Sequence, residues 1–406
     1  MESALKDPAA NRGPEEAGDR AAPTWHIITC EYPPQPGGVS DYTFSVARGL
    51  AAEGDEVHVW CPSSPVSRPA AEGVVAHSEL GEFAPVDLHR AGQHLDRFPA
   101  PRRILLQWVP HGYGYRSMNW KICSWLNDRV RKHGDRLEIM AHEAYLPFRI
   151  TSIRQSAAAA VHRMMTVQLM RAAERVWVSV PQWEACFRPY ALGNMPAFEW
   201  LPVPSNIAVA DNPGGVDAIR CQYANQNFLI GHFGTFGSLI TKCLEPILSE
   251  LAREPVAQTV LLIGRGSDEF RRAVAAKDPR IAPLIRSTGA LGNAEVSMHL
   301  AACDLLIQPF PDGVSGRRGS AMACISHGKP VVTTVGPSSE RTWSEALPMA
   351  PAGDAPAFLK LVRWLRDDPQ ERDRVALAAG QLYRERFDLK HTVSKLRAAA
   401  RKEKGV

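Results

Sequence analysis

Residues 308–334 constrain the fold of this chain more than any other stretch. They read QPFPDGVSGRRGSAMACISHGKPVVTT. The apolar run over residues 304–310 alternates little, which is typical of a strand with both faces buried. A helix is expected over residues 321–327, and a glycine and a proline should end it before a strand over residues 331–334. This order of strand, small-residue loop, helix and strand predicts an α/β domain.

The loop in the middle of this segment collects groups that suit an anion. Ser315, Gly316, Arg317 and Arg318 precede the N-terminus of the expected helix. Backbone N–H groups and the helix dipole favour negative charge at such a position, and two arginines can clamp a phosphate. The alternative interpretation is a solvated turn with ordinary surface arginines.

Composition narrows the class of protein. The chain has 406 residues, of which 45% are hydrophobic and 22% charged, so it should fold into two or three globular domains. Its net charge of +4 is mild and does not favour nucleic-acid binding. The 8 cysteines form no CxxC pair and are interpreted as reduced thiols of a cytoplasmic protein. Residues 1–23 lack the apolar core of a signal peptide and are expected to form a disordered leader.

The N-terminal half opens with a strand over residues 25–29, a proline-rich loop, a helix over residues 42–53 and a strand over residues 56–61. The loop contains Gly37, Gly38 and Val39, and paired glycines let the backbone approach a ligand closely. This is the opening unit of a doubly wound sheet.

Two later segments of this half carry candidate functional residues. A strand over residues 137–141 delivers His142 and Glu143 at its carboxyl end, where ligands bind in such sheets, although a lone strand-end histidine is more often structural. Residues 118–132 form an expected amphipathic helix rich in tryptophan and arginine. We favour a helix buried against the core and keep a membrane-surface or acceptor-binding helix as the alternative.

The same pattern restarts after a Pro/Gly-rich stretch. Strands are expected over residues 228–233 and 258–263, with helices over residues 244–253 and 294–302. The sequence therefore predicts an α/β protein with two doubly wound, Rossmann-like domains facing a central cleft. The expected parts are a domain over 24–205, a linker over 206–215, a domain over 216–385, and a final helix over 386–406 that can pack back on the first domain.

Taken together, the motifs resemble the two-domain GT-B glycosyltransferases, specifically the retaining family-4 type. The similar stretches, from about Trp25 onward, are EYPPQPGGVSDYT, WLPVPSNI, GHFGTFG, LLIGRG and AACDLLIQPFPDG with HGKPVVTT. The resemblance implies transfer of a sugar from a nucleotide diphosphate-sugar to an acceptor, with retention of anomeric configuration. It implies a donor-binding C-terminal domain, an acceptor-side N-terminal domain and no bound cofactor. No Asp-x-Asp motif stands in a suitable loop, so no metal is expected.

Two departures from the family stand out. Its paired glutamates fall on Ser315 and Ala323 here, and its arginine after the second glycine loop falls on Thr235. The chain resembles a variant with a GVS-x-RR-x-S loop, in which Arg317 and Arg318 are expected to supply the missing positive charge.

The resemblance also implies roles for individual residues. The donor diphosphate is expected at Gly234, Thr235, Lys242, Ser315, Gly316, Arg317 and Arg318. The base pocket is expected at Gly264, Arg265, Gly289 and Leu291. The loop of Gly37, Gly38 and Val39 should contact phosphate or acceptor. His142 is expected at the donor sugar, with His111 as the less favoured alternative, and Asp41 and Glu143 are expected to orient the acceptor hydroxyl.

Other functions remain open at this point. A GT-B epimerase or hydrolase fits the same motifs, and the missing glutamates allow a catalytically silent nucleotide-sugar-binding protein. A dinucleotide oxidoreductase is disfavoured because no GxGxxG follows the first strand. A two-lobed periplasmic binding protein fits the architecture but not the absence of a signal peptide. The expected acceptor is a carbohydrate, a lipid-linked molecule or a small molecule, and peripheral membrane contact is compatible with these.

Overall fold

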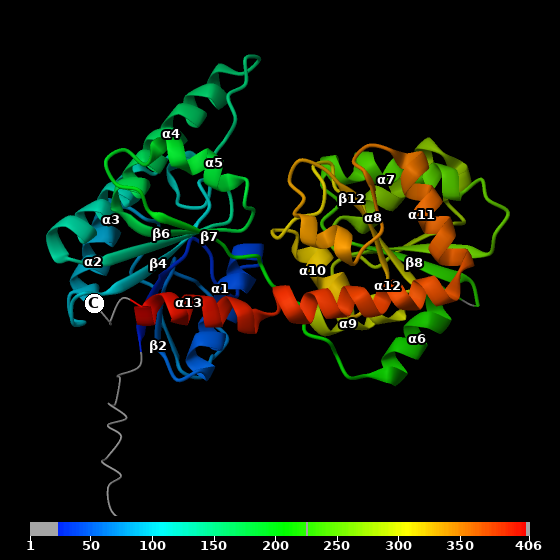
Figure 1. The fold of residues 1–406 in the computed structure, drawn as a ribbon, viewed down its shortest axis with the longest axis horizontal. Helices are drawn as coiled ribbons and strands as arrows, with labels where there is room; N and C mark the ends of the chain where they lie inside the picture. The colour runs from blue at the N-terminus through cyan, green and yellow to red at the C-terminus, as the bar shows by residue number, and fades with distance from the viewer. Residues whose placement is uncertain (1–22, 225, 403–406) are drawn as a thin grey trace, which may run out of the picture.

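The computed structural model describes residues 23–224 and 226–402. Apart from Pro23, the expected leader over residues 1–23 lies outside the described residues. Two α/β domains stand side by side, and the red C-terminal helix runs from the second domain back across the first (Figure 1).

The N-terminal domain is built on a parallel sheet of 7 strands in the order β3-β2-β1-β4-β5-β6-β7. The order runs outward in both directions from β1, which is the doubly wound arrangement. The strands are β1 Thr24–Ile28, β2 Glu56–Trp60, β3 Val74–His77, β4 Arg103–Trp108, β5 Arg136–Ala141, β6 Ala173–Val178 and β7 Ala197–Trp200. The helices are α1 Gly38–Ala52, α2 Pro85–Leu95, α3 Trp120–His133, α4 Ile153–Ala172 and α5 Trp183–Phe187, with short 3-10 turns η1 Tyr115–Ser117 and η2 Arg188–Tyr190.

The C-terminal domain repeats this plan with a parallel sheet of 6 strands in the order β10-β9-β8-β11-β12-β13. Its strands are β8 Phe228–Phe233, β9 Gln258–Ile263, β10 Ile285–Ser287, β11 Leu305–Gln308, β12 Val331–Val335 and β13 Met349–Pro351. Its helices are α6 Pro213–Tyr223, α7 Ser238–Leu251, α8 Ser267–Lys277, α9 Asn293–Ala302, α10 Gly319–Ser326, α11 Ala355–Asp367 and α12 Pro369–Leu382. The short turns are η3 Pro279–Ile281, η4 Arg341–Glu345 and η5 Tyr383–Phe387, and the last helix is α13 Leu389–Lys402. The predicted fold class of two Rossmann-like domains with a helical tail is confirmed.

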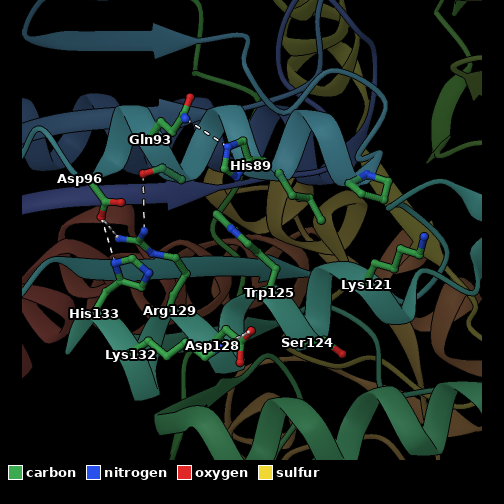
Figure 2. Close-up of a pocket in the computed structure, with 13 residues that line it drawn as sticks. His89, Gln93, Asp96, Lys121, Ser124, Trp125, Asp128, Arg129, Lys132 and His133 are labelled. Atoms are coloured by element: carbon green, nitrogen blue, oxygen red, sulfur yellow. Dashed lines mark hydrogen bonds and ion pairs between the residues drawn. The ribbon is translucent and has the colours of Figure 1, made fainter.

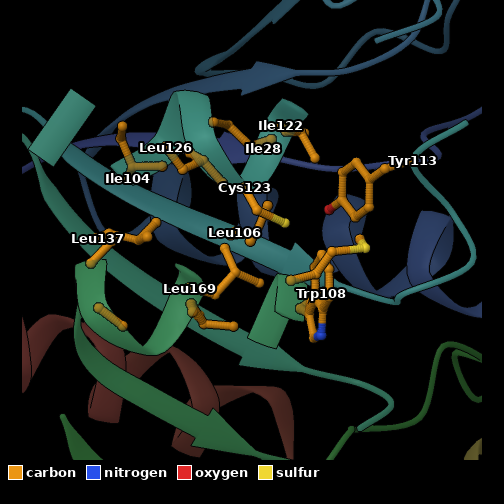
Figure 3. Packing of buried hydrophobic residues seen from close by; sticks show 14 of the residues in the cluster. Ile28, Ile104, Leu106, Trp108, Tyr113, Ile122, Cys123, Leu126, Leu137 and Leu169 are labelled. Carbon is orange, nitrogen blue, oxygen red and sulfur yellow. The ribbon is translucent and has the colours of Figure 1, made fainter. Parts of the chain in front are cut away.

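The central strands of both sheets, such as β4, β9 and β11, are buried on both faces, as their continuous apolar runs predicted. In the N-terminal domain, Leu106 of β4 and Leu137 of β5 pack against Ile122 and Leu126 of α3 and Leu169 of α4 (Figure 3). The apolar side of α3 therefore faces the core, in agreement with the favoured interpretation of residues 118–132.

The chain passes between the domains twice. The first crossing follows β7, and α6 begins at Pro213, inside the expected linker. The second crossing follows η5 and leads into α13, which packs on α1 of the N-terminal domain. Arg397 of α13 pairs with Asp55 at 3.1 Å, and Lys395 Nζ donates to the Trp200 carbonyl at 3.0 Å. The N-terminal domain is thus completed by the last helix of the chain.

Three neighbouring strands of the N-terminal domain place histidines side by side. His26 of β1 stacks on His58 of β2 with ring centroids 5.4 Å apart, and His58 Nδ1 lies 3.0 Å from His77 Nε2. Burial, followed by the charges of these neighbours, lowers the pKa of His26 to about 3. The buried ring is therefore neutral at pH 7.

This depressed pKa predicts acid sensitivity. In the unfolded chain, a histidine has a pKa near 6.5. As the pH falls from about 6.5 toward 3, His26 therefore binds a proton in the unfolded state but stays neutral in the folded state, and this difference lowers the free energy of unfolding. We expect His26 alone to remove about 2 kcal/mol of stability between pH 7.5 and pH 5. Urea denaturation at pH 7.5 and pH 5 measures this. His26→Gln should flatten the pH dependence, whereas the exposed His89→Gln should not. Equal stability of the wild-type protein at both pH values would contradict the prediction.

Candidate functional site

The candidate site is a cleft of about 580 Å³ between the two domains. Its walls come from loops at the carboxyl ends of strands in both sheets, where ligands bind in doubly wound folds. The lining residues with polar or glycine character are Gly37, Gly38, Asp41, Asn206, His232, Gly234, Thr235, Gly264, Arg265, Asn293, Gln308, Arg317, Arg318, Gly319 and Ser320.

A smaller cavity of about 320 Å³ opens beside the cleft on the N-terminal side. It contains His142 and Glu143 and shares Gly38, Asn206, Arg317 and Gly319 with the cleft. The two spaces are therefore compartments of one site, and Arg317 lies at their boundary.

Arg317 and Arg318 form the cationic corner of this site. Both guanidinium groups pair with Asp312, Arg317 at 2.8 Å. Burial works against ionisation of Asp312, but the two guanidinium groups outweigh it and hold the pKa of that carboxyl below its usual value. One positive charge remains after this pairing. Burial and the nearby charge of Arg317 also lower the pKa of Arg318. The two guanidinium groups are thus close together and share one carboxylate.

Each arginine of the corner is also held by an aromatic ring. The Arg318 guanidinium lies 4.7 Å from the ring centroid of Phe310, in its own domain. The Arg317 guanidinium lies 5.7 Å from that of Trp183, which belongs to α5 of the N-terminal domain. The cationic corner thus spans the gap between the domains.

Ser315 and Gly316 differ from the sequence expectation, because they do not line the cleft. Ser315 is fully buried. Gly316 N donates to the Glu340 carboxylate at 3.1 Å, and its carbonyl accepts from Val203 N at 2.7 Å. A Cβ at Gly316 would lie 2.7 Å from the Ser179 carbonyl oxygen. These two residues therefore fix the arginine loop against the N-terminal domain.

The first glycine loop is the N-terminus of α1, which begins four residues earlier than the sequence predicted. Glu31 Oε1 accepts hydrogen bonds of 3.0 Å from Val39 N and from Ser40 N. A Cβ at Gly37 would overlap that carboxylate, so a larger residue there would displace Glu31 from the helix N-terminus. The helix N-terminus already holds one anion from within the protein.

The smaller cavity holds a neutral histidine. His142 Nε2 donates to Gln107 Oε1 at 2.8 Å, and its ring meets Tyr42 edge-on at 4.8 Å. Burial lowers the pKa of His142 to about 3, so it carries no charge at pH 7. Glu143 pairs with the exposed His111 at 2.9 Å.

Asp41 is the carboxylate on the cleft side of α1. Burial raises its pKa, and a 2.7 Å hydrogen bond from Asn206 Nδ2 partly opposes this shift. Asn206 lies in the linker after β7, so this bond joins the first glycine loop to the segment that connects the domains.

The remaining predicted residues divide into two groups. Gly234, Thr235, Gly264, Arg265 and Leu291 line the cleft, as the resemblance implied for a nucleotide site. Gly289 is not among the residues that line the cleft. Lys242 is exposed on α7 and lines a separate pocket of about 200 Å³, so the structure does not bring it together with the cationic corner.

His232 and Gln308 are cleft residues that sequence reasoning missed. His232 is 1% exposed, its Nδ1 donates to the Ile307 carbonyl at 2.8 Å, and its Nε2 has no partner among the described residues. Burial lowers the pKa of His232 to about 4, so the ring is neutral and Nε2 is an acceptor. Gln308 Nε2 donates to the Phe233 carbonyl at 3.1 Å. The available signal was a polar residue near the carboxyl end of an otherwise apolar strand.

A different cavity, of about 450 Å³, lies between α2 and α3 (Figure 2). Several of its charged side chains form ion pairs with each other: Asp96 pairs with Arg129 at 2.9 Å and with His133 at 3.3 Å. It contains no strand end and no residue of the C-terminal domain. The interdomain cleft is therefore the stronger candidate. Within the described part of the chain, no three His, Cys, Asp or Glu side chains are grouped to hold a metal ion.

Comparison with protein-family models gives no match, and comparison with curated protein sequences gives none either. Solved structures do match over nearly the whole chain. Sucrose-phosphate synthase from Thermosynechococcus elongatus superposes with a TM-score of 0.74 at 15% identity, covering 94% of this chain and 98% of that one. Anabaena HepE in complex with UDP and glucose gives a TM-score of 0.66 at 16% identity, covering 93% and 99%.

WaaG, a glycosyltransferase involved in lipopolysaccharide biosynthesis, gives a TM-score of 0.63 at 17% identity, covering 91% of this chain and 98% of that chain. All three similarities extend across both domains and the cleft between them. The chain therefore has the GT-B fold, with both Rossmann-like domains and the returning C-terminal helix in place.

Proposed function

We propose that this protein is a glycosyltransferase that moves a sugar from a nucleotide diphosphate-sugar to an acceptor. The observation that carries the proposal is the convergence of the cationic corner, the Gly234–Thr235 loop and the first glycine loop on one interdomain cleft. The solved structure of HepE, which has the same fold, is that of a complex with UDP and glucose.

The C-terminal side of the cleft would bind the donor. Arg317 and Arg318 would face the diphosphate, with the N-terminus of α10 adding its dipole. Arg265 and Leu291 would border the nucleoside. As the nucleoside diphosphate leaves, negative charge builds on the phosphate, and fixed cations in a cleft stabilise that charge best. The neutral acceptor atom of His232 suits a hydrogen-bond donor, such as a sugar hydroxyl, on the same molecule.

The N-terminal side would bind the acceptor. Because Glu31 already occupies the N-terminus of α1, a second anion there would be repelled, so an uncharged acceptor group fits better than a phosphate. Asp41, which lines the cleft and has a raised pKa, and Glu143, which lines the smaller cavity, would orient the acceptor hydroxyl. His142 is neutral and would contact the donor sugar as a hydrogen-bonding group rather than as an acid.

The proposal includes retention of anomeric configuration and no metal ion. Retention follows from the family resemblance. The guanidinium groups of the cationic corner would supply the charge that a metal supplies elsewhere. All 8 cysteines are free thiols, which suits a reducing, cytoplasmic location.

A thermal-shift screen against nucleoside diphosphates and their sugar conjugates tests the donor assignment. A ligand present at about 100 times its Kd should stabilise the folded protein by about 2.7 kcal/mol. Product analysis with and without acceptor then separates transfer from hydrolysis or epimerisation, and NMR of the product reports the anomeric outcome. The proposal fails if no nucleotide raises the melting temperature. Binding without turnover across acceptors would instead indicate a silent binding protein.

A further inference from the structure

The segment that leaves the cleft after Glu143 forms an apolar tip at the far end of the N-terminal domain. This tip segment, residues 147–156, precedes and begins α4, and Figure 1 shows that end of α4 projecting beyond the rest of the domain. Ile150 is fully exposed, Ile153 is 88% exposed and Phe148 is 58% exposed. Three large apolar side chains so exposed at one projecting point are unusual for a surface facing only water.

Hydrogen bonds hold the tip segment in this shape. Ser156 Oγ donates to the Arg149 carbonyl at 2.9 Å and accepts from Arg149 N at 3.1 Å. Gln155 Nε2 donates to the Pro147 carbonyl at 3.2 Å, and Ser152 caps α4 by accepting from Gln155 N. The isoleucines are therefore presented outward by a built structure, not by a loose loop.

The tip segment and the rest of helix α4 carry charged side chains of one sign only. Residues 144–173 contain four arginines and no Asp, Glu or Lys, although the whole chain carries a net charge of only +4. Arg149 and Arg154 flank the exposed isoleucines, and neither forms an ion pair with any described residue. Exposed apolar side chains beside unpaired cations match an anionic lipid surface, which takes the former into its interface and attracts the latter.

We propose that the tip segment docks this protein reversibly onto an anionic membrane surface. The contact would be peripheral: among residues 23–224 and 226–402, no helix has the length and apolar character that a bilayer crossing needs. This surface differs from residues 118–132, whose apolar side packs on the core. The tip segment connects directly to His142 and Glu143, so docking would hold the smaller cavity of the site near the lipid headgroups.

Vesicle flotation of the full-length protein tests the proposal without any assay of activity. Vesicles of phosphatidylcholine alone are compared with vesicles that also contain phosphatidylglycerol. We expect wild-type protein to float with the anionic vesicles only, and less at high salt. Ile150→Ser with Ile153→Ser should lower the partition coefficient by about tenfold or more. Arg149→Gln with Arg154→Gln should lower binding to anionic vesicles specifically.

The matched control is Leu377→Ser on α12, because Leu377 is 74% exposed but lies in the C-terminal domain. It should float like the wild type, and unchanged melting temperatures would show that all variants fold. The proposal is overturned if wild-type protein stays unbound at low salt, or if the isoleucine variant floats like the wild type. It is also overturned if analytical ultracentrifugation shows a dimer that dissociates when the two isoleucines are replaced. A second copy of the chain, and not a membrane, would then cover the tip segment. None of these results depends on whether the cleft transfers sugar.

Discussion

In the proposed donor site, replacing Arg318 by alanine is expected to weaken binding of a nucleoside diphosphate, with UDP as the probe, by about 10- to 100-fold, and Arg317→Ala by a similar factor. Hydrogen bonds to charged groups contribute about 1.5–3 kcal/mol each, and this corner holds two cations against the single carboxylate of Asp312. Isothermal titration with UDP measures the loss. The kcat of sugar transfer should also fall in both variants, because the same guanidinium charges would stabilise the leaving nucleoside diphosphate.

Arg272→Ala is the matched control for this experiment. Arg272 lies on α8 of the same domain, and its only described partner is Glu269 at 3.4 Å. Its removal should leave UDP affinity unchanged, which separates a local effect from a general loss of positive charge. Lys242→Ala is a second informative variant, since Lys242 lies outside the cleft and should also bind UDP normally. Wild-type affinity in both corner variants would remove the diphosphate assignment.

The largest expected loss of stability comes from Phe387→Ala. Phe387 is 1% exposed, stacks on Trp343 with centroids 4.8 Å apart and meets Trp200 edge-on at 6.1 Å. Trp200 belongs to β7 of the N-terminal domain and Trp343 to η4 of the C-terminal domain. Truncating a fully buried phenylalanine typically costs about 3–5 kcal/mol, and here the cavity would open where the two domains meet.

Urea denaturation followed by tryptophan fluorescence measures this loss. Phe387→Leu should retain most of the stability, because a smaller apolar side chain still fills part of the space. Phe148→Ala, at a residue with an exposed ring, should change the denaturation midpoint little. An unchanged midpoint in Phe387→Ala would show that this aromatic contact does not hold the domains together.

The doubly wound fold was predictable because buried parallel strands have a clear pattern. β8 and β9 have the bounds that their apolar runs predicted. A continuous apolar run of this length is typical of a strand in a parallel sheet that helices cover on both faces. β3 and α2 had no such signal. β3 is an edge strand of four residues with partly exposed side chains, and its alternation is too short to recognise.

The start of α1 shows another limit. Its first N–H groups are capped by the carboxylate of Glu31, which lies six residues before the N-cap Gly37. Local capping rules do not consider so distant a carboxylate. α7 likewise begins at Ser238, six residues before its predicted start, although Pro246 lies inside it.

The site was predicted in outline and missed in detail for a related reason. A motif identifies the loop that approaches a ligand, so Arg317 and Arg318 could be found from sequence. Whether a loop residue faces the cleft or the other domain depends on tertiary packing, which is why Ser315 and Gly316 were assigned to the diphosphate although they anchor the loop. His232 required knowing that a neighbouring carbonyl would engage Nδ1 and leave Nε2 as the acceptor.

The position of α13 sets an order on the folding of a newly made chain. The face of α1 that carries Val46 and Leu50 shares a core cluster with Val393 and Leu396, so it has no complete cover until those residues have been synthesised. Arg103 of β4 also donates to the Ala400 carbonyl, near the last described residues. The strands and helices of the C-terminal domain are contiguous in the chain, and its core is complete once η5 has been made. The first half made is thus the second to be finished, and its exposed apolar face must be shielded from other chains throughout translation.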